Sequence, residues 1–158
     1  MAAITSDSKG SVRASFDAQE AAVLRDLIDE MATLLAHEGP EDPVQKRLFP
    51  EAYESTEDSK KFADLIGDEL RQSKLGALQA MERTLGERGP VDASIAEQDA
   101  EAWLAALTDL RLAIGTRLGV TEETMSSEID PDDPSAATLA VLHWLGWLQE
   151  SMIEALNG

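Results

Sequence analysis

The chain has 158 residues, of which 13 are Lys or Arg and 31 are Asp or Glu, so its formal net charge is −18. It holds no cysteine, which excludes a disulfide framework, a thiolate nucleophile and a zinc–thiolate site within this chain. A negative field repels nucleic-acid phosphates and anionic lipid, so neither autonomous nucleic-acid binding nor membrane binding is expected. The N-terminal residues lack the apolar segment of a secretory signal, which predicts a cytoplasmic chain.

The N-terminal residues predict a tail followed by a short strand. Residues 1–9 are expected to form a mobile tail, and residues 10–158 a single helical domain. Ser11–Phe16 alternates apolar and polar side chains, as a half-buried strand does. Asp17 precedes a helical pattern and Glu20 follows three residues later, which is the spacing of a capping box. We therefore expect the first long helix to begin just after Asp17.

Apolar residues recur at spacings of three and four along most of the remaining chain, which is typical of amphipathic helices. Val91–Ile95 instead predicts a second strand, which could pair with Ser11–Phe16. The predicted fold class is all-α, a compact bundle of four long helices and one short helix, with or without this small two-stranded β-ribbon. The long helices are expected near residues 18–37, 57–87, 96–118 and 134–156, and the short helix near residues 43–49.

The third long helix carries two of the few cations of the chain. Arg111 and Arg117 lie at the two edges of its apolar stripe. Because an unpaired buried charge is costly, each of them needs a carboxylate or backbone carbonyls. Glu69 lies among apolar positions of the preceding helix, so we predict a structural ion pair of Glu69 with Arg111, Arg117 or both. The alternative is that the two arginines form an anion or substrate site.

Two glycines four residues apart end the same helix, in the sequence GTRLG. This stretch lacks the Lys-Ser or Lys-Thr and the preceding strand of a phosphate loop. We interpret Gly115 as a position where a neighbouring helix approaches closely, with Gly146 as the matching contact on the last helix. Gly119 is interpreted as a helix C-cap.

The last helix has polar and aromatic side chains away from its core stripe. His143 and Trp147 lie off that stripe, one turn apart. Tryptophan is enriched at interface hot spots, so the two residues predict a partner surface, and homodimerisation is its simplest version. Folding of the acidic loop at residues 121–133 over Trp147 is an equal alternative. The core stripe itself is predicted to consist of Val141, Leu145, Leu148, Met152 and Leu156.

No catalytic, cofactor-binding or metal-ligating residues are predicted. His37 and His143 are the only histidines and are far apart in the sequence, whereas a zinc site needs more ligands. The acidic stretch that begins at Asp130 lacks the glycine and the later glutamate of a calcium loop. Among the many carboxylates, no spacing selects a catalytic pair.

Four stretches of the sequence are distinctive, and they span nearly the whole chain from about Val12. They are RLFPEAY (Arg47–Tyr53), DELRQSKL (Asp68–Leu75), AWLAALTDLRLAIGTRLGV (Ala102–Val120) and LHWLGWLQESMIEAL (Leu142–Leu156). In content and order they resemble an actinobacterial domain-of-unknown-function family that includes the oxidative-stress regulator AosR. Members of that family are typically encoded beside the Clp adaptor ClpS.

The resemblance implies a cytoplasmic, non-enzymatic regulatory protein that acts through contacts with a protein partner, with a sigma factor or a Clp component as the expected partner. The family's regulator is described as sensing oxidation through a Cys-x-x-x-Cys disulfide, which this chain cannot form because it holds no cysteine. A Clp-linked adaptor or structural interaction protein is the first alternative. An enzyme that uses Arg111 and Arg117 as an anion site in a helical active site is the second.

Overall fold

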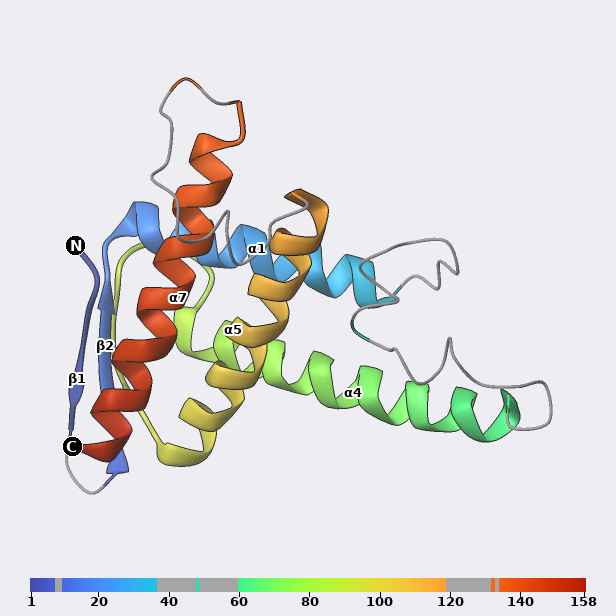
Figure 1. Ribbon diagram of the computed structural model, residues 1–158. Helices are drawn as coiled ribbons and strands as arrows, with labels where there is room; N and C mark the ends of the chain where they lie inside the picture. Colours follow the sequence, from blue (N-terminus) through green and yellow to red (C-terminus); the bar gives the residue numbers. More distant parts are fainter. Residues whose placement is uncertain (8–9, 37–47, 49–59, 119–131, 133) are drawn as a thin grey trace.

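Four long helices make up most of the chain in the computed structural model, as the apolar spacing predicts (Figure 1). The structure describes residues 1–7, 10–36, 48, 60–118, 132 and 134–158. The helices are α1 (Ala18–Ala36), α4 (Lys60–Leu85), α5 (Glu97–Leu118) and α7 (Ala136–Asn157).

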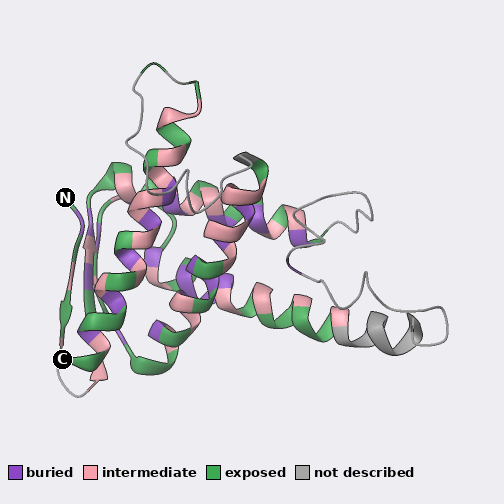
Figure 2. Ribbon diagram, in the orientation of Figure 1, coloured by how far each residue is buried: buried purple, intermediate pink, exposed green. Residues whose placement is uncertain are grey.

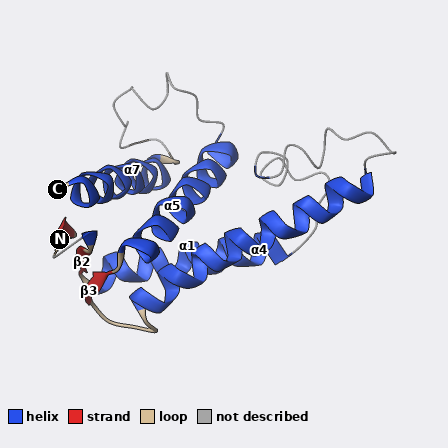
Figure 3. Ribbon diagram, turned by 90° about the horizontal axis from the view of Figure 1, so that it is seen from below, coloured by secondary structure: helices blue, strands red, loops and turns tan. Residues whose placement is uncertain are grey.

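Three short strands form an antiparallel sheet in the order β1–β2–β3. The central strand β2 (Val12–Phe16) pairs with β1 (Ala3–Ser6) on one side and with β3 (Val91–Ile95) on the other. The helices lie on one face of this sheet (Figure 3). The side chains of β2 that are buried toward them are those of Val12, Ala14 and Phe16.

The sheet corrects two expectations. The predicted pairing of the two strands is confirmed, but a third strand joins them, so the fold is mostly helical rather than all-α. Residues 1–9 are not a tail throughout, because β1 pairs with β2 along its whole length. The hydroxyl of Ser6 also donates a hydrogen bond to the carbonyl of Ala155 at 2.9 Å, which ties β1 to the end of α7.

The central helix is α5, which packs against α4 and α7 and also contacts α1 (Figure 3). Its Trp103 side chain is fully buried and stacks on Phe16 of β2, with ring centroids 6.0 Å apart and planes 4° from parallel. Trp144 of α7 meets the same Phe16 ring edge-on, at 6.3 Å. Trp103 Nε1 donates to the Thr84 hydroxyl of α4 at 3.4 Å. These contacts join the sheet to three helices. Buried residues gather where the helices face the sheet and one another (Figure 2).

The predicted capping box at the start of α1 is confirmed. The backbone N–H of Glu20 donates to Asp17 Oδ1 at 2.8 Å, and the backbone N–H of Asp17 donates to Glu20 Oε1 at 3.0 Å. The first of these bonds stabilises the carboxylate and lowers the pKa of Asp17 below its ordinary value. Glu20 Oε2 also accepts the backbone N–H of Ala2 at 2.8 Å, so the same side chain joins β1 to α1.

An arginine from another helix caps the C-terminal end of α4. The helix ends at Leu85 and the chain turns through Gly86, whose φ of +68° favours glycine. Carbonyls at a helix end lack intrahelical donors, and here Arg25 of α1 supplies them. Its Nη2 donates to the carbonyls of Leu85 at 2.6 Å and Gly89 at 3.0 Å, and its Nε donates to that of Gly86 at 3.0 Å.

Several predicted features lie outside the described residues. They include the short helix near residues 43–49 apart from Leu48, which is helical and buried. They also include His37, Gly119 and the loop at residues 121–133 apart from Asp132.

Candidate protein-interaction site

Glu69 is exposed on α4, and the structure brings it to neither Arg111 nor Arg117. The predicted structural ion pair between Glu69 and an arginine is therefore corrected. The reason is that the buried part of α4 lies toward its C-terminal end. Near Glu69 the helix is exposed to solvent, and the neighbouring Leu70 is 38% exposed. Among the described side chains of α4, those of residues 67–85, the buried ones are Leu78, Ala80, Met81 and Leu85.

A short ion pair joins Lys74 of α4 to Asp109 of α5, and a longer and more exposed one, at 3.9 Å, joins Arg83 of α4 to Asp99 of α5. Lys74 Nζ donates to Asp109 Oδ1 at 2.8 Å, and the two side chains are only 16% and 13% exposed. The carboxylate of this pair is on α5 and the cation is on α4, whereas the prediction placed the carboxylate on α4 and the arginine on α5. Nothing in the sequence of either helix singled out this pair, because each residue is one of several charges on its helix.

Arg111 lies between α5 and α7 and is bound by an amide instead of a carboxylate. Its Nη1 donates to Gln149 Oε1 at 2.7 Å. The Gln149 Nε2 in turn donates to the Thr108 hydroxyl at 2.6 Å and to the Leu104 carbonyl at 3.3 Å. Arg111 Nε is buried and has no hydrogen-bond partner among the described residues. The cluster fixes α7 against α5 through neutral acceptors.

The glycines of α5 and α7 do not form the predicted matching contact. A Cβ atom added to Gly146 would lie 3.4 Å from Arg111 Nη2, so Gly146 gives room to the arginine side chain. A Cβ atom added to Gly115 would meet no atom within 4 Å. The interpretation of Gly115 as a close-approach position is therefore wrong.

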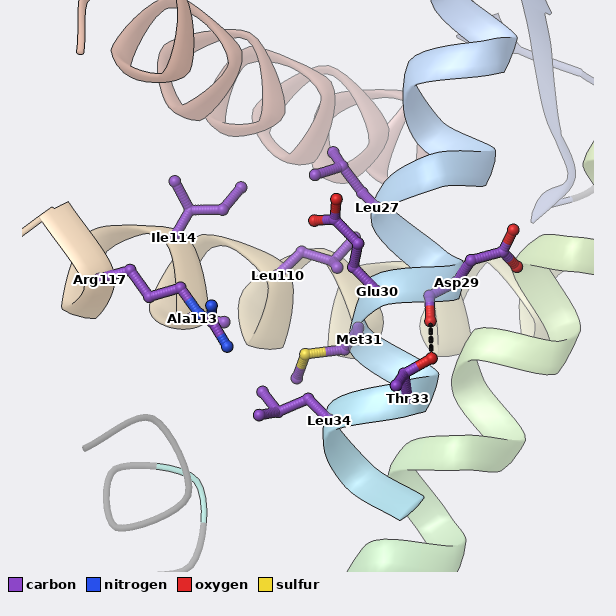
Figure 4. Close-up of a pocket in the computed structure, with 10 residues that line it drawn as sticks. All are labelled: Leu27, Asp29, Glu30, Met31, Thr33, Leu34, Leu110, Ala113, Ile114 and Arg117. Carbon is purple, nitrogen blue, oxygen red and sulfur yellow. Dashed lines mark hydrogen bonds between the residues drawn. The ribbon is translucent and has the colours of Figure 1, made fainter. Parts of the chain in front are cut away.

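Arg117 is exposed and lines an open groove between α1 and α5 (Figure 4). The groove has a volume of about 720 Å³ and a mostly apolar lining. Asp29 and Glu30 of α1 line the same groove as Arg117. Two carboxylates among the lining residues of a groove oppose the binding of an anion in it. The apolar residues of the lining are Leu27, Met31, Leu34, Leu110, Ala113 and Ile114.

The two arginines therefore line different surfaces of α5. Arg111 faces α7, whereas Arg117 faces the groove beside α1. They are six residues apart, which places them about 120° apart around a helix. This arrangement gives no support to a shared anion site.

The outward side of α7 carries the predicted partner residues. Trp147 is 44% exposed and His143 is half-buried, while the opposite side of the helix is buried (Figure 2). Glu150 and Glu154, both exposed, continue the same strip. We call these four residues, His143, Trp147, Glu150 and Glu154, the α7 face. The alternative that residues 121–133 cover Trp147 concerns residues outside the described part.

The sequence prediction found the two aromatic members of the α7 face but missed the two glutamates. The signal was present, since residues 143, 147, 150 and 154 follow the four-three-four spacing of a single helical strip. Ile153, which is also 44% exposed, borders the strip. Leu142, Leu145, Leu148, Met152 and Ala155 form the buried side of the helix.

The described residues contain no group of three or more His, Asp or Glu side chains placed to hold a metal ion. Among the described helices, none is both long and apolar enough to span a membrane.

Comparison with known proteins gives one family. The sequence model of the family described as Domain of unknown function (DUF2017) matches residues 1–156. Proteins of Mycobacterium bovis and Mycobacterium tuberculosis, each named oxidative stress regulator AosR, are 31% identical over 133 residues, which is 75% of this chain and 60% of theirs. The chain thus spans about 60% of the length of these curated relatives. No solved structure matches.

The family match extends from β1 through all but the last residue of α7. It confirms the resemblance inferred from the four sequence stretches. The chain belongs to the family described as Domain of unknown function (DUF2017).

Proposed function

We propose that the protein is a non-enzymatic cytoplasmic regulator in an oxidative-stress response and that it acts through protein–protein contacts. The observation that carries the proposal is the 31% identity, over 75% of this chain, with relatives named oxidative stress regulators. A regulatory role is supported at the family level by these names. The direct partner is proposed to be a transcription component such as a sigma factor.

The α7 face supports contact with a protein. Trp147 is a large aromatic residue that is 44% exposed, although the helix has a complete buried side for packing within the chain. Tryptophans at protein interfaces contribute more to affinity than most residues. The α7 face is therefore the proposed contact region.

The regulation is proposed not to use thiols. The chain holds no cysteine, so no disulfide can form within it or between it and a partner. Three of its five methionines, Met31, Met81 and Met152, are buried, which protects them from oxidation to sulfoxides. In this proposal the chain associates with its partner, and an oxidant signal enters through a component other than a thiol of this chain.

The enzyme alternative depends on Arg111 and Arg117 acting together. Arg111 is bound to Gln149 between two helices, and Arg117 shares its groove with Asp29 and Glu30. Neither position offers the convergent, carboxylate-free cleft that an anionic substrate would need. The geometry therefore supports the binding protein better than this enzyme.

Affinity capture from native cytoplasmic extract tests the proposal, with sigma factors and Clp components quantified first. The wild type should retain a transcription component that Trp147→Ala loses. Leu70→Ala is the matched control, because Leu70 is a comparably exposed large apolar residue, at 38%, on α4. Equal recovery with all three proteins would contradict the proposal, and recovery of Clp components alone would favour the adaptor.

A second arm of the experiment addresses the thiol question. The captured partner is replaced by purified partner, and the chain alone is treated with diamide before the two are mixed. Affinity should be unchanged, because diamide oxidises thiols and the chain has none. A loss of affinity that dithiothreitol reverses would be incompatible with the proposed mechanism.

A further inference from the structure

We propose that the α7 face binds a basic amphipathic helix of the partner protein. The inference deepens the proposed function and rests on it, because it names the chemistry of the partner at the same surface. It starts from the arrangement of the four residues along α7. Residues at four-three-four spacing lie one above another on a helix, so the α7 face is a straight strip about 16 Å long. A strip of this shape and spacing matches the seam that one helix offers to another.

The charges of the strip define which helix would fit. Glu150 and Glu154 are one turn apart, both are exposed, and among the described residues neither forms an ion pair. Carboxylates at this spacing repel each other. Some other carboxylates of the described chain have a cation beside them, as Asp92 has Arg13 at 3.0 Å and Asp109 has Lys74 at 2.8 Å. Glu150 and Glu154 therefore form an unmatched acidic end of the α7 face.

Trp147 stands one turn before this acidic end and adds a second attraction for cations. A guanidinium or ammonium group packs favourably over an indole ring, and arginine does so most often. An arginine that lies over Trp147 could reach the Glu150 carboxylate, so the ring and the carboxylate would hold the same group. Ile153, 44% exposed at the border of the strip, offers an apolar contact beside them. A helix with basic side chains beside an apolar stripe can therefore contact Trp147, Glu150 and Ile153 together.

A second copy of the chain fits this surface less well. It would bring a further charge of −18 and the same two glutamates to the contact. Like charges facing each other across an interface are destabilising. The basic helix of a different protein removes the repulsion between Glu150 and Glu154, whereas a homodimer adds to it.

The test measures fluorescence anisotropy of labelled synthetic peptides with the full-length chain. Two helical peptides share one leucine stripe and differ only at the flanking positions, which are Arg and Lys in the basic peptide and Glu in the acidic one. We expect the basic peptide to bind with a Kd of about 10–100 µM, and the acidic peptide to show no binding at about 1 mM. Trp147→Ala should weaken the basic peptide about tenfold.

The matched variants test the role of the glutamates. Glu150→Gln/Glu154→Gln should weaken the basic peptide by at least about fivefold and reduce the dependence of Kd on salt. Asp26→Asn/Glu30→Gln is the control, because it removes the same charge from two exposed positions at the same spacing on α1. The control should change the Kd by less than about twofold.

Four outcomes would overturn the inference. They are equal weakening by the two double variants, no binding of the basic peptide at about 1 mM, equal binding of both peptides, and a dimer in light scattering that Trp147→Ala dissociates. Failure here is distinguishable from failure of the proposed function. If a native partner is lost with Trp147→Ala but the basic peptide does not bind, the regulatory role stands and only the chemistry assigned to the partner is wrong.

Discussion

Lys74 and Asp109 differ from the other paired charges of the described chain in how little water reaches them. Their side chains are 16% and 13% exposed, compared with 53% and 63% for Arg13 and Asp92. Exposed pairs contribute little, because water competes for both charges. A poorly solvated pair contributes through the penalty that follows when one member is removed.

Removal of either member of the Lys74–Asp109 pair should destabilise the fold. For a fully buried pair the cost is about 3–5 kcal/mol, and with a small exposed fraction on both side chains we expect about 1–3 kcal/mol for Asp109→Asn or Lys74→Met. The double variant should recover part of the loss, with a coupling free energy of about 1–2 kcal/mol. Urea denaturation measures all four free energies of unfolding.

Two controls accompany this cycle. The exposed pair Arg13–Asp92, treated in the same way, should show a coupling below about 1 kcal/mol. Glu69→Gln should change the free energy of unfolding by less than about 0.5 kcal/mol, because Glu69 is exposed. Additive effects of Lys74→Met and Asp109→Asn would show that the two side chains do not interact in solution.

The helices were the most predictable elements, because their signal is local. The predicted boundary of 96–118 for α5 is within one residue of the observed Glu97–Leu118. The strand β1 could not be predicted, because AITS has no alternation of its own and is held by pairing with β2 and by the Ser6–Ala155 hydrogen bond. Such long-range contacts leave no pattern in the segment itself.

The residues of the candidate site were likewise predictable only where the signal is local. Trp147 was predictable, since a large aromatic residue off the core stripe of α7 is visible in the sequence. The position of Glu69 was not, because the apolar spacing of α4 identifies one side of the helix but not how far along it α5 and α1 extend. Burial in α4 is confined to residues from Leu78 onward among the described side chains of residues 67–85, so Glu69 lies beyond the covered part.

Gly115 and Gly86 should respond in opposite directions to replacement by alanine. Gly115→Ala should stabilise by about 0.5–1 kcal/mol, because the added methyl group meets no atom within 4 Å and alanine favours the helix. Gly86→Ala should destabilise, because its φ of +68° strains any residue with a Cβ atom. Thermal unfolding followed by circular dichroism measures both. A destabilised Gly115→Ala would mean that a helix neighbour does approach this position.

Because of the capping box of α1, the stability of the chain should depend on pH in the acidic range. The folded-state pKa of Asp17 is lowered mainly by the backbone N–H of Glu20. The contribution of its carboxylate is therefore fully present above the unfolded-state pKa of about 3.9 and is lost as the pH falls through the lower folded-state pKa. The difference in Tm between wild type and Asp17→Ala should accordingly shrink below about pH 4.

Asp17→Asn is the control for this titration. Asparagine is an equally good N-cap residue but carries no charge, so the difference in Tm between Asp17→Asn and Asp17→Ala should not follow the same pH dependence. A wild-type advantage over Asp17→Ala that grows as the pH falls would have the wrong sign for the capping bond.

At the scale of the whole molecule, the excess of acidic residues acts against folding. A net charge of −18 on 158 residues produces repulsion that the compact state concentrates. Two of the few cations make specific contacts: Lys74 joins α4 to α5, and Arg25 of α1 caps the end of α4. The surface is left with carboxylates that no cation offsets, as on the α7 face.

Salt should therefore stabilise the chain. Raising NaCl from about 0.02 M to about 0.5 M shortens the screening length to a few ångströms, and the Tm should rise by about 2–4 °C, which corresponds to about 1 kcal/mol for a chain of this size. Repetition in KCl separates screening from effects of a particular ion. A Tm that is constant or falls would show that the local ion pairs, which salt weakens, outweigh the general repulsion.

The arginine that caps α4 has a consequence for the order in which the chain acquires structure. Arg25 is separated by 60 to 64 residues from the three carbonyls it binds. During vectorial synthesis it emerges well before them, and α4 cannot complete its end until α1 has docked. In the folded protein, detachment of α1 would at once release the last turn of α4 and residues 86–90, which lead into β3. The two helices then open and close as one cooperative unit, although residues 37–59 separate them in the sequence.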